Sequence, residues 1–136
     1  MNTRVCIDSD TIAAMPRLFA LRGAISVDRN DAQDILDATA ELMRAIMERN
    51  ALPPADVVSC IFTATNDLNA EFPAVAARAV GFDRVPLLCA REIAVPRSLP
   101  RVIRVLIHYY ADDDHEPVHV YLGEAGALRA DLEAAQ

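Results

Sequence analysis

Five short apolar runs with strand character constrain the fold of this chain more than any other feature. Only two stretches between them have helical periodicity, and strand and helix signals do not alternate regularly toward the C-terminal end. This pattern favours an α+β fold over a doubly wound sheet. The expected strands are residues 18–27, 56–65, 85–93, 101–110 and 118–122.

The two helical stretches differ in length. After Asn30, a candidate N-cap with Gln33 in capping-box position, apolar residues recur at intervals of three and four up to Asn50. This spacing predicts an amphipathic helix lying on a sheet. A shorter helix is expected over residues 73–80, because Pro73 suits a first turn and Gly81 a stop. We expect residues 125–132 to form a short, weakly helical tail.

Length and charge limit the class of protein. A chain of 136 residues is one ordinary domain, and we expect a flexible N-terminal arm over residues 1–16 and a folded domain over 17–136. The net charge of −7 argues against nucleic-acid binding. No membrane span or signal peptide is evident, and the three cysteines are unpatterned, so we expect a cytoplasmic protein with reduced thiols.

Three charged residues interrupt the apolar runs. Arg22 and Arg104 lie inside strand-like segments, and Glu92 lies at the end of another. Ionised groups removed from water cost several kcal/mol unless they are paired. Pairing of Glu92 with one arginine leaves the other without an acid. Because the guanidinium fork matches a carboxylate, these residues predict a site for a small dicarboxylate, with internal pairing as the alternative.

Several motifs occur in order from Arg17 to Leu132. They are Leu21-Arg22-Gly23-Ala24; Thr63 to Leu68 with Phe72-Pro73-Ala74 and Arg78; Val85-Pro86 with Cys89 and Glu92; Ile103-Arg104-Val105; and His119 to Leu122 with Leu128-Arg129. Together they resemble the AroH-type chorismate mutases. The resemblance implies a homotrimer that forms a pseudo-α/β-barrel, with a five-stranded mixed sheet and two helices per subunit and a site at each interface.

The resemblance also implies the chemistry, a rearrangement of chorismate to prephenate without cofactor or metal. Arg22 would grip one carboxylate and Tyr121 would support a carboxylate. Arg104 would reach the ether oxygen and a carboxylate. Glu92 would hold the ring hydroxyl together with Cys89. The positions that line or close the site from the neighbouring subunit or a mobile tail would be Phe72, Arg78, Leu128 and Arg129.

Cys89 and Val75 affect how the residue roles of the family apply to this chain. Strand alternation puts Cys89 and Glu92 on opposite faces, unless a bulge intervenes or Cys89 contributes only its backbone. Val75 stands where the family often has a lysine, which weakens attraction of an anionic substrate.

Other readings of the sequence lead to different functions. His115 and His119 near Asp112, Asp113 and Asp114 could suggest a metal site, but an acidic turn is usually solvated, and we expect no metal there. Two rivals to the mutase remain. One is an imine or enamine hydrolase of the Rid type, which also uses an interfacial arginine, and the other is a non-catalytic trimeric binding module.

Overall fold

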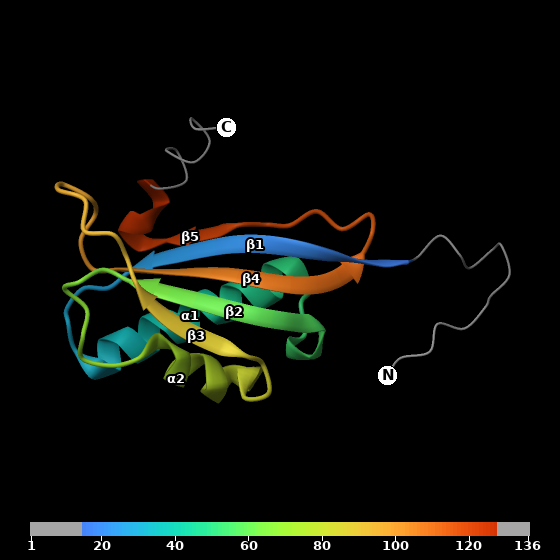
Figure 1. Ribbon diagram of the computed structural model, residues 1–136, viewed down its shortest axis with the longest axis horizontal. Helices are drawn as coiled ribbons and strands as arrows, with labels where there is room; N and C mark the ends of the chain where they lie inside the picture. Colours follow the sequence, from blue (N-terminus) through green and yellow to red (C-terminus); the bar gives the residue numbers. More distant parts are fainter. Residues whose placement is uncertain (1–14, 128–136) are drawn as a thin grey trace, which may run out of the picture.

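A single mixed β-sheet organises the protein, whose computed structural model describes residues 15–127. Its strands lie in the order β3-β2-β4-β1-β5 (Figure 1). They are β1 (Pro16–Ser26), β2 (Val57–Ala64), β3 (Leu87–Arg91), β4 (Val102–Asp112) and β5 (Val120–Leu122). The central strand β4 is antiparallel to β1 and β2, whereas β3 is parallel to β2 and β5 is parallel to β1. The expected α+β fold with five mixed strands is confirmed.

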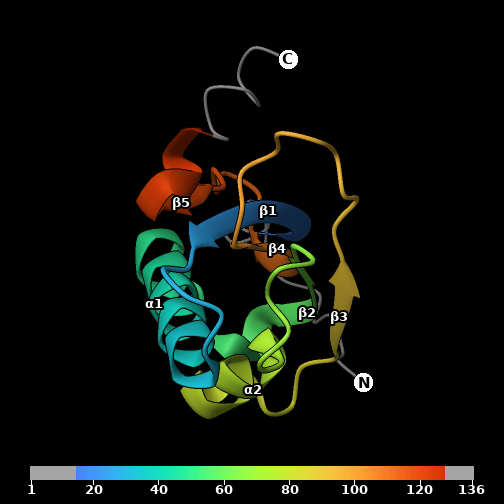
Figure 2. The ribbon, with the colours of Figure 1, turned by 90° about the vertical axis from the view of Figure 1, so that its left-hand side faces the viewer.

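Both helices cover the same face of this sheet (Figure 2). They are α1 (Ala32–Asn50) and α2 (Pro73–Ala77). Alternate residues of β1 and β4, such as Leu21 and Ile107, are fully buried with Leu42 of α1. Gly23 allows the close approach of α1, because a Cβ atom there would lie 2.8 Å from the Cδ1 atom of Ile46. One face of each long strand therefore supplies the core.

The opposite face of the sheet, called here the open face, is largely uncovered. Its side chains come from alternate positions of all five strands: Leu18, Ala20, Arg22 and Ala24 of β1, Arg104, Leu106, His108 and Tyr110 of β4, Ile61 and Thr63 of β2, Leu88 and Ala90 of β3, and Tyr121 of β5. Leu18, Leu88 and Tyr110 are exposed. Near one end, Ala24 and Val102 are covered by Ala125 of a short 3-10 turn (Gly123–Ala125). The open face thus combines charged residues with uncovered apolar ones.

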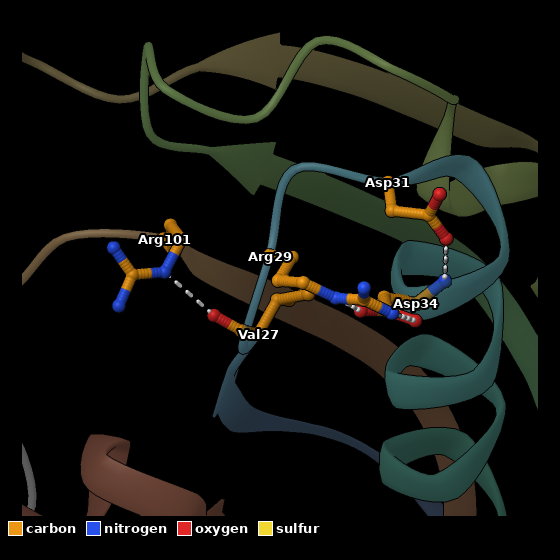
Figure 3. A network of polar contacts seen from close by, with 5 residues as sticks. All are labelled: Val27, Arg29, Asp31, Asp34 and Arg101. Atoms are coloured by element: carbon orange, nitrogen blue, oxygen red, sulfur yellow. Dashed lines mark hydrogen bonds and ion pairs between the residues drawn. The ribbon is translucent and has the colours of Figure 1, made fainter.

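The start of α1 differs from the expected capping. Its N-cap is Asp31, whose Oδ2 atom accepts a hydrogen bond from the Asp34 N–H at 3.1 Å (Figure 3). Asn30 instead accepts hydrogen bonds from the N–H groups of Asn69 and Ala70. The predicted cap is therefore one residue early, and Asn30 ties the turn before α1 to the loop after β2.

Further polar contacts fix the sheet end that leads into α1. Arg29 pairs with Asp34 at 2.9 Å, and this ion pair raises the pKa of Arg29. The Arg101 Nε atom donates to the Val27 carbonyl at 2.9 Å (Figure 3). The chain just after β1 is thereby bound to the chain just before β4.

Element boundaries also differ in places. Residue Pro16 already begins β1, and residues 1–14 of the expected arm lie outside the described part. The second helix ends at Ala77 and passes into a π turn (Arg78–Phe82) in which Gly81 has φ 117°. Of the expected tail over residues 125–132, Ala125 ends a 3-10 turn (Gly123–Ala125), residues 126 and 127 are helical, and residues from 128 onward lie outside the description. Within residues 15–127, no helix has the length and apolar character needed to cross a membrane.

Side chains hold the segment that precedes β5, which begins two residues later than expected. The Tyr109 hydroxyl lies 2.6 Å from the His115 Nε2 atom, and the His115 ring packs edge-on against Phe19. The buried Asn50 side chain at the end of α1 donates to the Val118 carbonyl at 2.9 Å and accepts from the Val118 N–H at 2.7 Å. Asn50 thus acts as a substitute strand partner for this segment.

Replacing Asn50 tests that interpretation. Asn50→Ala removes both bonds to Val118, and we expect the free energy of unfolding to fall by roughly 2–3 kcal/mol, since unmade hydrogen bonds of partly buried groups cost about this much. Denaturant unfolding of Asn50→Ala beside Arg44→Ala, an exposed change on the same helix, measures the effect. Equal stability of the two variants would contradict the role of Asn50.

Candidate active site

One row of side chains crosses the sheet on the open face. Strand pairing aligns Tyr121 with Ala24, Ala24 with Arg104, Arg104 with Thr63, and Thr63 with Ala90. The row begins at β5 and ends at β3, so residues from the whole width of the sheet meet along one line. Tyr121 packs against the small cluster around Ala24.

Glu92 joins this row from the residue just after β3. The Arg104 Nε atom lies 3.4 Å from the Glu92 Oε2 atom, and the Thr63 hydroxyl donates a short hydrogen bond to the same oxygen. Two donors from neighbouring strands therefore orient one carboxylate. Glu92 thus pairs with one of the two arginines, which is the internal pairing considered as the alternative in the sequence analysis. The sequence reading gave no role to Thr63, although its alternation with the buried Phe62 places it on the same face as Arg104.

Arg22 lies one step along the sheet from this cluster. It pairs in register with Leu106, two residues from Arg104, and such diagonal neighbours have Cα atoms about 7–8 Å apart. Among the described residues, ion pairs involve Arg104, Glu92, Arg29 and Asp34, and none involves Arg22. The face therefore holds two guanidinium groups and one carboxylate, which leaves a positive charge to attract an anion.

The expectation that these charges are buried needs correction. The side chains of Arg104 and Glu92 are 47% and 21% exposed, and Arg22 is also exposed. In the single chain, apolar neighbours along the strand face the helices, while the charged residues point to the other side. The sequence alone did not show whether these strands are covered on one face or on both faces.

The start of β4 is fixed by contacts with the loop after β2. Asp67 accepts hydrogen bonds from the Arg101 N–H on both carboxylate oxygens, at 3.0 and 3.1 Å. The Thr65 hydroxyl donates to Asp67 and accepts from the Val102 N–H. Arg101 adopts a left-handed φ of 50°, a strained conformation for a residue other than glycine that these contacts hold. The backbone at the start of β4, just before Arg104, is therefore constrained.

A second group of predicted residues lies at the edge strand β3 and the loop before α2. Phe72, which is 66% exposed, and Cys89 line a groove of about 410 Å³ together with Leu68 and Arg91. Arg91 donates to the carbonyls of Thr65 and Leu68 and so supports the loop beside the groove.

Cys89 and Glu92 do not meet within one chain. Cys89 pairs in register with the buried Phe62 and packs toward the helix-covered side, whereas Glu92 bonds to Thr63 on the open face. The opposite placement of these two residues, expected from strand alternation, is therefore observed. Arg78 lies exposed at the end of α2, and Leu128 and Arg129 fall outside the described residues.

The arrangement offers charge and hydrogen bonds to a ligand. Burial raises the pKa of the Cys60 thiol to about 12, so Cys60 is a core residue and not a nucleophile. No group of three His, Cys, Asp or Glu side chains within residues 15–127 could hold a metal ion. His115 and His119 are used elsewhere, since His115 contacts Tyr109 and the His119 Nδ1 atom accepts from the Arg22 N–H. The geometry suits electrostatic binding of a carboxylate-bearing ligand.

Comparison with known proteins identifies similar chains. The family model described as chorismate mutase type I matches residues 18–132. A chorismate mutase AroH of Thermus thermophilus is 50% identical over 118 residues, covering 85% of this chain and 97% of the relative. A chorismate mutase AroH of Bacillus subtilis (strain 168) is 40% identical over 114 residues, covering 82% and 90%. A solved chorismate mutase from Clostridium thermocellum superposes with a TM-score of 0.75 at 42% identity, covering 80% of this chain and 98% of that one.

Proposed function

The chain belongs to the type I chorismate mutases, and from this premise we propose how its residues divide the work of catalysis between neighbouring subunits. The protein is a chorismate mutase, an isomerase of aromatic amino-acid biosynthesis that rearranges chorismate to prephenate. The family match decides against the imine hydrolase alternative. The observation that carries the residue assignment is the Arg104–Glu92–Thr63 cluster beside an arginine without an acidic partner among the described residues.

The reaction needs no nucleophile, because one carbon–oxygen bond breaks while one carbon–carbon bond forms. An enzyme accelerates it by holding the substrate folded in a near-attack conformation and by placing donors where charge develops on the ether oxygen. We assign the ether oxygen to Arg104, since its guanidinium remains partly exposed despite the contact with Glu92. Arg22 and Tyr121 then hold the carboxylates, and the second oxygen of Glu92 accepts from the ring hydroxyl.

The second group of residues supports a site shared between subunits. Phe72 and Cys89 line a groove at the edge strand β3, and Cys89 packs toward the helix-covered side whereas Arg104 stands on the open face, which favours their meeting a ligand held by Arg104 of a neighbouring subunit. Exposed apolar residues on the open face, including Leu88 at 60% exposure, supply a surface that association would bury. We therefore propose a homotrimer forming a pseudo-α/β-barrel, in which Phe72, Arg78 and Cys89 of one subunit face Arg104 of the next. Leu128 and Arg129 are proposed to close the site.

The activity itself is tested with purified protein, chorismate and no added metal or cofactor. Loss of chorismate absorbance with formation of prephenate is the expected result. Release of ammonia from an imine substrate would instead indicate the hydrolase, and binding of chorismate without turnover would indicate a module that has lost catalysis.

Arg104 is expected to contribute most to turnover. Arg104→Ala should lower kcat by roughly 100- to 1000-fold, as loss of one oxyanion donor does elsewhere. Arg104→Lys should also fail substantially, because a point charge lacks the planar fork. Steady-state kinetics on chorismate measure both, with Arg44→Ala on the outer side of α1 as the control. Turnover near the wild-type value in either variant would remove Arg104 from the mechanism.

Thr63 is expected to matter through its hydroxyl. Thr63→Val keeps the shape but removes the donor to Glu92, and we expect kcat/KM to fall by about tenfold, in keeping with a lost hydrogen bond to a charged group. Thr63→Ser keeps the donor and should stay within about threefold of the wild type. Equal losses in the two variants would show that packing of the methyl group, rather than the hydroxyl, matters.

The shared site predicts complementation between inactive variants. Arg104→Ala and Arg78→Ala subunits, unfolded together and refolded as an equal mixture, should form mixed trimers in which some sites receive both arginines. Random assembly of a cyclic trimer gives about one quarter of sites intact, so activity should return to about that fraction of wild type. Each variant refolded alone is the control. No recovery in mixtures that do form mixed trimers would place both arginines in one subunit's site.

A further inference from the structure

His119 occupies an unusual place beside β1. The strand β5 pairs with β1 over only three residues, from Gly23 opposite Val120 onward. Just before that pairing, the Arg22 N–H donates to the Nδ1 atom of the His119 ring at 3.0 Å. An imidazole nitrogen thus serves as the acceptor at the point where a backbone carbonyl would continue a ladder.

This contact acts on the backbone of a residue assigned to substrate binding. The side chain of Arg22 stands on the open face, where its register partner Leu106 lies two residues from Arg104, and its own backbone N–H is held from the β5 side. Nearby, Asn50 holds Val118 through two hydrogen bonds. The backbone next to His119 is therefore held in place, which fixes the position of the imidazole that accepts from the Arg22 N–H.

The chemical requirement is specific. A ring nitrogen that accepts a hydrogen bond carries no hydrogen, so the ring is neutral, with its proton on Nε2. An aliphatic side chain at this position would leave the Arg22 N–H without this acceptor. The backbone of Arg22 would then be less constrained. Binding of its guanidinium to a carboxylate would cost more conformational entropy.

We propose that His119 is a positioning residue for Arg22, acting through its Nδ1 acceptor and not through contact with the substrate. The inference rests on the proposed role of Arg22 in holding a chorismate carboxylate. Because that hold is made in the ground state as well as the transition state, its weakening raises KM more than it lowers kcat.

The experiment compares two substitutions of His119 with a neighbouring control. His119→Ala removes the acceptor and should raise KM for chorismate about tenfold, the factor that corresponds to loss of one ordinary hydrogen bond. His119→Asn places an amide oxygen on Cγ, where Nδ1 is attached, and should keep KM within about threefold of wild type. Val118→Ala changes an exposed neighbouring side chain and should leave KM unchanged. Equal KM increases for the Ala and Asn variants would overturn the proposal.

A double-variant cycle separates positioning from a general structural role. If His119 acts through Arg22, adding His119→Ala to Arg22→Ala should raise KM no further than Arg22→Ala alone. Independent, multiplying effects would overturn the inference. The single variant Arg22→Ala separates the role of Arg22 from that of His119. An unchanged KM in Arg22→Ala would overturn both the role of Arg22 and the positioning role of His119. A raised KM in Arg22→Ala together with an unchanged KM in His119→Ala would overturn only the role of His119.

Discussion

The two-residue period of the long strands β1 and β4 is the constraint on which the rest of the structure depends. It sends Leu21 and Ile107 into a core against α1, and it sends Arg22 and Arg104 to the other side of the same strands. A shift of either strand by one residue would bury the guanidinium groups and expose the core. The same strand register therefore determines both the packing of the core and the face on which Arg22 and Arg104 lie.

Charge on the open face suits the proposed site to an anion. Glu92 offsets one arginine and is itself oriented by Thr63, so its remaining oxygen can accept a hydrogen bond. The guanidinium of Arg22 has no ion pair among the residues described. A pericyclic reaction demands little else from a protein than such fixed charges and a shaped cavity, because no proton must be transferred.

Precise placement comes from side chains that act as backbone partners. Asp67 binds the Arg101 N–H, Asn50 binds both polar groups of Val118, and His119 accepts from the Arg22 N–H. Each contact replaces a regular ladder bond where the sheet ends or becomes irregular. The strand that carries Arg22 is therefore held where its pairing with β5 begins, and the strand that carries Arg104 is held just before its first residue.

The sequence by itself determined the five strands, the two helices and the interrupting charges, because apolar periodicity and residue type are local properties. Strand alternation also predicted the opposite placement of Cys89 and Glu92, whereas the pairing of Glu92 with an arginine was only an alternative. Only the tertiary structure decided that Arg22 and Arg104 are exposed, that Asp31 and not Asn30 caps α1, and that Thr63 shares Glu92 with Arg104. Those facts depend on which strands become neighbours and in what register. The local sequence pattern carries no signal of a partner far away along the chain.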